Sequence, residues 1–325
     1  MTELAVLGAG AWGTALANVL ARDGRPVTLL ARDVEAAADM ERRRENVRRL
    51  PGVPLAASVR VTADPAALAG AGTILAAVPT QALRGALRAA RPHGRGGTLV
   101  LCAKGIERGT GAFPADIARA EWPDAALAVL SGPSFAADVA RGLPTAVTLA
   151  SADLVEAERL CALIGTRSFR PYASTDVAGV EIGGAGKNVL AIACGVAAGL
   201  DLGASASAAL TARGFAELSR FGRALGARSE TLMGLSGLGD LLLTCGSAQS
   251  RNFSLGLSVG RGASPASVMA ERLAEGAWTA PVLLDLARAH GVDMPIAASV
   301  EAVLAGRSDV GSAVAALLER PFRAE

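Results

Sequence analysis

The chain has 325 residues, enough for two domains that each bury a hydrophobic core. Hydrophobic residues make up 51% of it and aromatic residues only 3%, a composition typical of a helix-rich globular protein. The formal net charge is +2 and charges of both signs are interleaved, which excludes the broad basic surface that binds nucleic acid or an anionic membrane.

The cysteines and the N-terminus indicate the compartment. Four cysteines, at 102, 161, 194 and 245, have no paired spacing, so we expect neither a disulfide framework nor a zinc site. No charged leader precedes a cleavable apolar segment, and the longest uncharged apolar run, Val189 to Leu200, is too short to span a membrane. We therefore expect a cytoplasmic protein without an integral membrane segment.

The first motif follows a short apolar run, Leu4 to Leu7, and precedes a helical pattern. It is a G-x-G-x-x-G sequence in which Gly8 permits the tight turn, Gly10 lets a pyrophosphate approach the backbone, and Gly13 lets the helix pack on the strand. A second strand, Val27 to Ala31, follows at the spacing of a βαβ unit. This order predicts a dinucleotide-binding turn.

Two charged residues, Arg32 and Asp33, stand at the end of the second strand. An acidic residue here binds the adenosine ribose of NAD, whereas arginine accommodates the extra phosphate of NADP. Because Arg32 comes first, we expect NADP to be preferred. Asp33 keeps NAD open, and an ordinary solvated turn would explain both residues.

Further short apolar segments predict strands, with helices or loops between them, at 59–62, 73–78, 98–102, 127–130, 146–149 and 169–172. This alternation predicts an α/β doubly wound sheet of the Rossmann type, with ligands beyond the carboxyl ends of its strands. From about residue 175 the pattern is helical throughout. We expect a Rossmann domain at 1–175 and an all-α substrate and catalytic domain at 176–325.

Lysine occurs only at Lys104 and Lys187, whereas the other 30 basic residues are arginine. Chance would explain either lysine alone, but both lie beside glycines in apolar settings, and a buried lysine can lose its proton while arginine cannot. Neither His93, in a loop, nor His290, at a helix end, resembles a catalytic base. Lys187 is the better candidate if its pKa falls from about 10.4 to roughly 7 or 8.

Two motifs of the second half carry polar groups. Asp240 lies in an apolar run, where it could orient the lysine or cap a helix. The sequence Ser250-Arg251-Asn252 opens a helix with a hydroxyl, a guanidinium and an amide, which suits a phosphate, although a cap beside a surface arginine would look the same.

Six motifs, in order and across nearly the whole chain, resemble bacterial NAD(P)-dependent glycerol-3-phosphate dehydrogenase. They begin at Gly8, Ala103, Ser131, Gly183, Gly237 and Gln249. The resemblance implies reversible reduction of dihydroxyacetone phosphate to sn-glycerol 3-phosphate for phospholipid synthesis, with NADP or NAD as cofactor, in a cytoplasmic homodimer.

The resemblance also implies roles for individual residues. Lys187 would exchange the proton, while Lys104 and Asp240 would hold the reacting oxygen. The substrate would be held by Gly132, Ser134, Ser250, Arg251 and Asn252. Cofactor contacts would come from Ala11, Trp12, Arg32, Lys104, Ala136, Arg251, Leu273 and Glu275, besides the glycines of the turn. Phe253 and Ala277-Trp278 depart from the family pattern.

Two alternatives remain open on the sequence. One is another oxidoreductase with a helical-domain lysine, such as a 3-hydroxyacid or ketopantoate reductase, against which Arg251-Asn252 favours a phosphorylated substrate. The other is a dinucleotide-binding regulator without turnover. An assay of nicotinamide absorbance with dihydroxyacetone phosphate separates them.

Overall fold

A computed structural model describes residues 3–94, 97–271 and 274–319. The chain forms two compact units, Met1–Lys104 with Ala112–Glu181, and Gly105–Gly111 with Ile182–Glu325. The division therefore falls inside a helix, a few residues beyond the change of pattern near residue 175, and a short loop after Lys104 belongs to the second unit.

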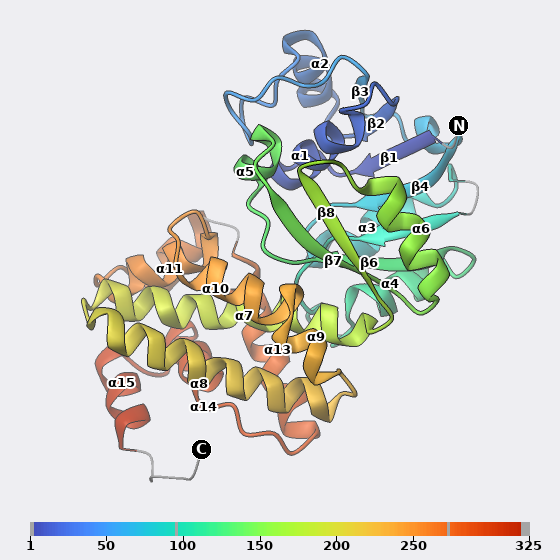
Figure 1. Ribbon diagram of the computed structural model, residues 1–325. Helices are drawn as coiled ribbons and strands as arrows, with labels where there is room; N and C mark the ends of the chain where they lie inside the picture. The colour runs from blue at the N-terminus through green and yellow to red at the C-terminus, as the bar shows by residue number, and fades with distance from the viewer. Residues whose placement is uncertain (1–2, 95–96, 272–273, 320–325) are drawn as a thin grey trace. The chain divides into compact units, whose positions relative to one another are not determined.

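The first unit is built on an eight-stranded sheet of order β3-β2-β1-β4-β5-β6-β7-β8 (Figure 1). All neighbouring strands are parallel except β6 and β7. The strands are β1 Glu3–Leu7, β2 Val27–Leu30, β3 Val59–Thr62, β4 Ala71–Ala76, β5 Thr98–Leu101, β6 Ala126–Ser131, β7 Thr145–Ser151 and β8 Phe169–Ser174. Each apolar segment predicted as a strand forms one, so the doubly wound Rossmann-type fold is confirmed.

Helices cover both faces of this sheet because successive strand residues point to opposite sides. Leu4 and Val6 pack in one core with α1 and α6, whereas Ala5 and Leu7 pack in the other with α3 and α4. The helices of this unit are α1 Ala11–Ala21, α2 Val34–Arg43, the 3-10 turn η1 Pro65–Leu68, α3 Thr80–Ala90, α4 Pro114–Glu121, α5 Ala136–Arg141 and α6 Leu154–Ile164.

All the secondary-structure elements described in the second unit are helices. Its elements are α7 Val177–Gly199, which begins in the first unit, α8 Gly203–Ala224, α9 Ser229–Met233, the π-helical turn η2 Leu235–Gly239, α10 Asp240–Cys245, α11 Arg251–Gly260, α12 Pro265–Glu271, α13 Glu275–Ala289, α14 Pro295–Leu304 and α15 Val310–Leu318. Figure 1 shows α7 and α8 running alongside each other, and Leu190 of α7 lies against Gly214 of α8.

Helix α7 is buried in the core of this unit, and close packing against α11 explains glycines on both helices. Gly183, Gly184 and Gly186 lie inside α7, which begins at Val177. A Cβ at Gly195 would lie 2.1 Å from the carbonyl oxygen of Phe253, and one at Gly256 would lie 2.0 Å from that of Ile192. Glycine is therefore required where the backbones of α7 and α11 meet.

Among the described residues, α7 is also the one helix that meets the length and hydropathy of a membrane span. Within the structure, however, 83% of its apolar window is buried. The same test is passed by the core helix of a protein that never enters a membrane, and packing against α8 and α11 gives α7 that position here.

Candidate active site

The glycine turn between β1 and α1 has the geometry that its sequence predicts. Gly8 has φ +110°, and a Cβ there would lie 2.7 Å from Val78 Cγ1. A Cβ at Gly13 would lie 1.9 Å from the carbonyl oxygen of Gly8. By contrast, nothing surrounds the Cβ position of Gly10, which precedes α1. The turn therefore has no room for side chains at Gly8 and Gly13, whereas its backbone is open at Gly10, before the N-terminus of α1.

The open end of α1 suits an anion. Ala11 and Trp12 are its first residues, its first turn holds no acidic side chain, and no side chain caps it. Its backbone N–H groups and helix dipole favour a phosphate there. Asn46, which sequence reasoning did not find, braces the turn by donating to the Ala9 carbonyl oxygen at 3.0 Å and to Thr14 Oγ1 at 2.8 Å.

The two charged residues after β2 have different surroundings. Asp33 caps α2, and its carboxylate accepts a hydrogen bond of 2.7 Å from the backbone N–H of Ala36. Arg32 is exposed. Because one carboxylate oxygen of Asp33 is engaged in this cap, it is less available to bind the ribose of NAD. This favours the interpretation that Arg32 binds the extra phosphate of NADP.

Three of the predicted substrate-binding residues meet at one carbonyl group in the first unit. Lys104 Nζ and Ser134 Oγ each donate to the carbonyl oxygen of Gly132 at 2.9 Å. Gly132 has φ +139°, and a Cβ there would lie 2.9 Å from Val147 Cα, so no other residue fits. Ala136, predicted to contact the cofactor, is the first residue of α5, which packs against α1. The loops after β5 and β6 thus carry a cation and a hydroxyl side by side.

Lys187 is buried in the second unit and ion-paired. Its Nζ lies 2.7 Å from Asp240 Oδ1 and donates to Thr244 Oγ1 at 2.8 Å. The Lys187 and Asp240 side chains are only 8% and 1% exposed. Asp240 is the first residue of α10 and is preceded by Gly239 as the cap, so its carboxylate orients the lysine and does not cap the helix. Burial disfavours the ammonium form and the carboxylate favours it, so the two effects oppose each other.

The Ser250-Arg251-Asn252 motif is divided among three tasks. Ser250 caps α11 by accepting a hydrogen bond from the Phe253 N–H, as the structural alternative anticipated. Arg251 is exposed. Asn252 is buried, donates to Asn188 Oδ1, and accepts from the Gly276 N–H, each at 2.9 Å. Asn252 therefore joins the starts of α11 and α13 to the residue next to Lys187.

Family models match both parts of the chain. Residues 3–157 match the N-terminal part of NAD-dependent glycerol-3-phosphate dehydrogenase, and residues 176–315 match its C-terminal part. The chain belongs to this family.

Individual relatives agree with the family models. The chain is 60% identical to the glycerol-3-phosphate dehydrogenase [NAD(P)+] of Bradyrhizobium sp. (strain BTAi1), over 99% of this chain and 98% of the relative. It is 57% identical to that of Methylobacterium radiotolerans, over 100% and 98%. The solved structure of glycerol-3-phosphate dehydrogenase from Coxiella burnetii superposes with a TM-score of 0.93 at 38% identity, covering 98% of this chain and 99% of that one. The chain is thus an NAD(P)-dependent oxidoreductase of the glycerol-3-phosphate dehydrogenase family.

Two further predictions about this glycerol-3-phosphate dehydrogenase family member concern the approach to α13. Leu273 lies outside the described residues. Glu275 begins α13. Trp278, which the sequence analysis set apart from the family pattern, lies under the guanidinium of Arg108, whose Cζ is 4.1 Å from the ring centroid. The bulky ring therefore serves as a cation–π platform within the second unit.

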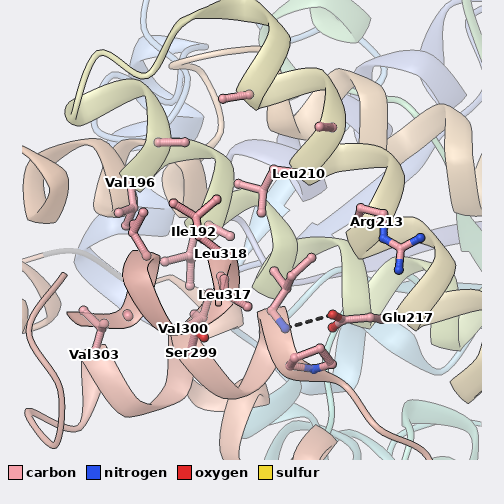
Figure 2. Close-up of a pocket in the computed structure, with 18 of the residues that line it drawn as sticks. Ile192, Val196, Leu210, Arg213, Glu217, Ser299, Val300, Val303, Leu317 and Leu318 are labelled. Carbon is pink, nitrogen blue, oxygen red and sulfur yellow. Dashed lines mark hydrogen bonds between the residues drawn. The ribbon is translucent and has the colours of Figure 1, made fainter. Parts of the chain in front are cut away.

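A cavity of about 670 Å³ lies elsewhere in the second unit (Figure 2). Aliphatic side chains of α7, α8, α14 and α15 line it, and Glu217 stands at one side, where it accepts hydrogen bonds from the Ile296 and Ala297 N–H groups. Burial raises the pKa of Glu217 to about 7. The described lining of the cavity contains none of the residues predicted to bind substrate or cofactor.

Proposed function

We propose that this chain catalyses the reversible NAD(P)H-dependent reduction of dihydroxyacetone phosphate to sn-glycerol 3-phosphate, with Lys187 as general acid and base. The observation that carries the proposal is the buried ion pair between Lys187 and Asp240. Lys187 is one of only two lysines in a chain whose other basic residues are arginines. A carbonyl reduction needs a proton donor, and the ammonium of Lys187 is held ready by two oxygens at 2.7 and 2.8 Å.

The proton inventory of the reaction agrees with this role. A nicotinamide cofactor, when bound, would supply the hydride. Lys187 gives its proton to the oxygen of the reacting carbonyl and takes it back in the reverse direction. Asp240 keeps the amine charged and oriented before transfer, and Thr244 Oγ1 accepts a hydrogen bond from it. An arginine could hold the same charge but could not exchange the proton.

The residues of the first unit fit a dinucleotide. Gly8, Gly10 and Gly13 would let the pyrophosphate approach the start of α1, where Ala11 and Trp12 offer backbone N–H groups. We further propose that NADP is preferred to NAD, because Arg32 is exposed at the end of β2 while Asp33 is engaged as the cap of α2.

We propose distinct tasks for the residues that bind the substrate. Lys104 and Ser134, gathered at Gly132, would bind oxygen atoms of the substrate, and exposed Arg251 would bind its phosphate as a bidentate partner. Asn252 would act by fixing Asn188 beside Lys187. A phosphorylated substrate distinguishes this proposal from ketopantoate reduction.

We also propose a cellular role. Formation of sn-glycerol 3-phosphate would supply the backbone of glycerophospholipids. The family resemblance further implies that the enzyme works in the cytoplasm as a homodimer. The cellular role rests on the proposed reaction, whereas the location and the dimer rest on the family resemblance.

The test is Lys187→Arg, measured by the loss of nicotinamide absorbance with dihydroxyacetone phosphate. We expect the variant to bind NADPH and to lose turnover by at least ~100-fold, the usual contribution of a positioned acid. Arg288→Lys on the surface of α13 is the matched control and should keep the parent rate. Near-normal kcat in Lys187→Arg would end the acid–base assignment, and NADPH binding without turnover in the parent enzyme would favour a regulator.

A further inference from the structure

The segment that directly follows Lys104 packs with the second unit. Residues 105–111 belong to that unit, whereas Lys104 itself belongs to the first. Glu107 is buried, and its carboxylate accepts a hydrogen bond of 2.6 Å from Thr110 Oγ1. The Gly111 N–H donates to the Glu107 carbonyl oxygen at 3.0 Å. These bonds give residues 105–111, which we call the 105–111 loop, a defined shape.

Two contacts place the 105–111 loop along α13. Arg108 Cζ lies 4.1 Å from the centroid of the Trp278 ring. Farther along the helix, Leu286 Cδ2 lies 3.6 Å from the position that a Cβ on Gly111 would take. Trp278 and Leu286 are eight residues apart in α13, a spacing that keeps both on one broad face of a helix. The loop therefore follows one face of α13.

The contact between Arg108 and Trp278 has a fixed side and a free-standing side. Ala277 and Thr279, on either side of the tryptophan, are buried, so the backbone that carries the ring is held in α13. Arg108 is exposed and belongs to the loop. A guanidinium over an indole at an exposed site shifts an equilibrium by about two- to fivefold. The ring therefore favours the position of the loop against α13.

The first turn of α13 also contacts the residue beside Lys187. The Gly276 N–H donates to Asn252 Oδ1 at 2.9 Å. A Cβ on Gly276 would lie 2.4 Å from the carbonyl oxygen of Asn188, which directly follows Lys187. The same turn thus supports the neighbour of one lysine and the loop that leads out of the other, Lys104.

We propose that Trp278, through Arg108, is a positioning residue for Lys104. The contact holds the 105–111 loop on α13, and the loop limits the movement of the Lys104 backbone, to which it is joined directly. Lys104 Nζ donates to the Gly132 carbonyl oxygen at 2.9 Å, and that bond requires the backbone of Lys104 to stay in place. The effect on turnover rests on the proposed function, whereas the effect on the Lys104 side chain does not.

The first test measures the reactivity of the two lysine amines, the only ones in the chain. The full chain is treated with limiting acetic anhydride, and acetylation of each lysine is followed by mass spectrometry of peptides. In Trp278→Leu we expect Lys104 to react at least twice as fast as in the parent, because its amine leaves the Gly132 carbonyl more often. Buried Lys187 should keep its parent rate, and Trp278→Phe, which retains a ring, should restore slow acetylation of Lys104.

The second test is a double-mutant cycle on turnover. We expect Trp278→Leu to lower kcat/KM for dihydroxyacetone phosphate at least threefold in the parent, yet to change it little when Lys104 is already replaced by methionine. The reason is that the ring acts through the Lys104 amine. A ring that only stabilised the fold would lower kcat/KM equally in both backgrounds. Arg108→Met should behave as Trp278→Leu does.

The first unit offers a matched control. Arg170 Cζ lies 5.7 Å from the centroid of the Tyr172 ring, and both residues lie on β8. Tyr172→Leu removes a contact of the same kind from a place that is not joined to Lys104. This variant should leave both the acetylation of Lys104 and kcat/KM at the parent values.

Each outcome decides a different part of the proposal. Unchanged acetylation of Lys104 in Trp278→Leu overturns the positioning role. Faster acetylation with an equal loss of kcat/KM in both backgrounds overturns its effect on the reaction. If Trp278→Leu folds poorly, Arg108→Met takes its place with the same readouts. An inactive parent would contradict the proposed function, yet acetylation would still report whether the ring holds Lys104.

Discussion

Asp240→Asn tests how the buried ion pair controls the proton of Lys187. The substitution keeps the shape of the side chain but removes its charge from a site where Asp240 is 1% exposed and Lys187 Nζ is 2.7 Å away. Breaking a buried pair from one side costs about 3–5 kcal/mol. Releasing the proton of an ordinary lysine at pH 7 costs about 4.6 kcal/mol, at 1.36 kcal/mol for each pH unit below 10.4. Since the two costs are similar, the amine of the variant will be divided between its two forms near neutral pH.

The change in the protonation of Lys187 should shift the pH profile of the enzyme in a definite direction. In the direction of carbonyl reduction Lys187 gives its proton, so the ammonium is the active form and the rate falls as pH rises through the apparent pKa of kcat/KM. In Asp240→Asn that falling limb should move to lower pH by about two units or more. The free energy of unfolding should also fall by about 3 kcal/mol, measured by urea titration.

The matched control is Asp285→Asn on α13. Asp285 pairs with Arg288 at 2.8 Å, but the two side chains are 74% and 69% exposed. Such surface pairs contribute only about 0–1 kcal/mol, so this variant should keep the parent pH profile and stability. If Asp240→Asn had the pH profile of the parent, the carboxylate would not hold the catalytic proton and the reasoning would be refuted.

Three other substitutions test separate parts of the structure. Arg32→Ala should raise KM for NADPH more than for NADH, and an equal change in both would contradict the 2′-phosphate interpretation. Because burial raises the pKa of Glu217 to about 7, the folded state keeps a proton that the unfolded state releases near pH 4.5, so stability should fall as pH rises between these values, by up to about 3 kcal/mol. Glu217→Gln mimics the protonated form and should flatten that pH dependence in urea titrations; an unchanged slope would mean that another group titrates. Gly256→Ala should destabilise by about 1–3 kcal/mol, because its Cβ would lie 2.0 Å from the Ile192 carbonyl oxygen, whereas Gly85→Ala on α3 has open space and should not.

Local sequence patterns were enough to predict the sheet and the glycine turn. The apolar segments that form strands are short and bounded by turn residues. Neighbouring residues such as Ala5 and Val6 pack in cores on opposite faces of the sheet, as the two-residue period of a strand requires. Likewise, Gly13 is required by its contact with the Gly8 carbonyl oxygen inside one strand–turn–helix unit, and Gly8 is favoured by its own positive φ. Such interactions join residues that are close in the sequence, so sequence patterns alone predict them.

Helix boundaries in the second unit were less predictable. The segment before Lys187 contains three glycines, which locally disfavour a helix, and yet α7 runs through them from Val177. Close contacts with other helices override that preference: Gly186, for example, leaves room for Leu218 of α8. The identity of those neighbours depends on distant parts of the chain.

The sequence by itself determined the fold class and the family and predicted the lysine most suited to proton exchange, because these inferences depend on local periodicity, ordered motifs and residue type. Only the tertiary structure decided what that lysine touches. It placed Asp240 and Thr244 on the amine and used Asp33 and Ser250 as helix caps. The physical reason is that a buried charge acquires its properties from neighbours supplied by other helices, and no sequence spacing specifies which ones they are.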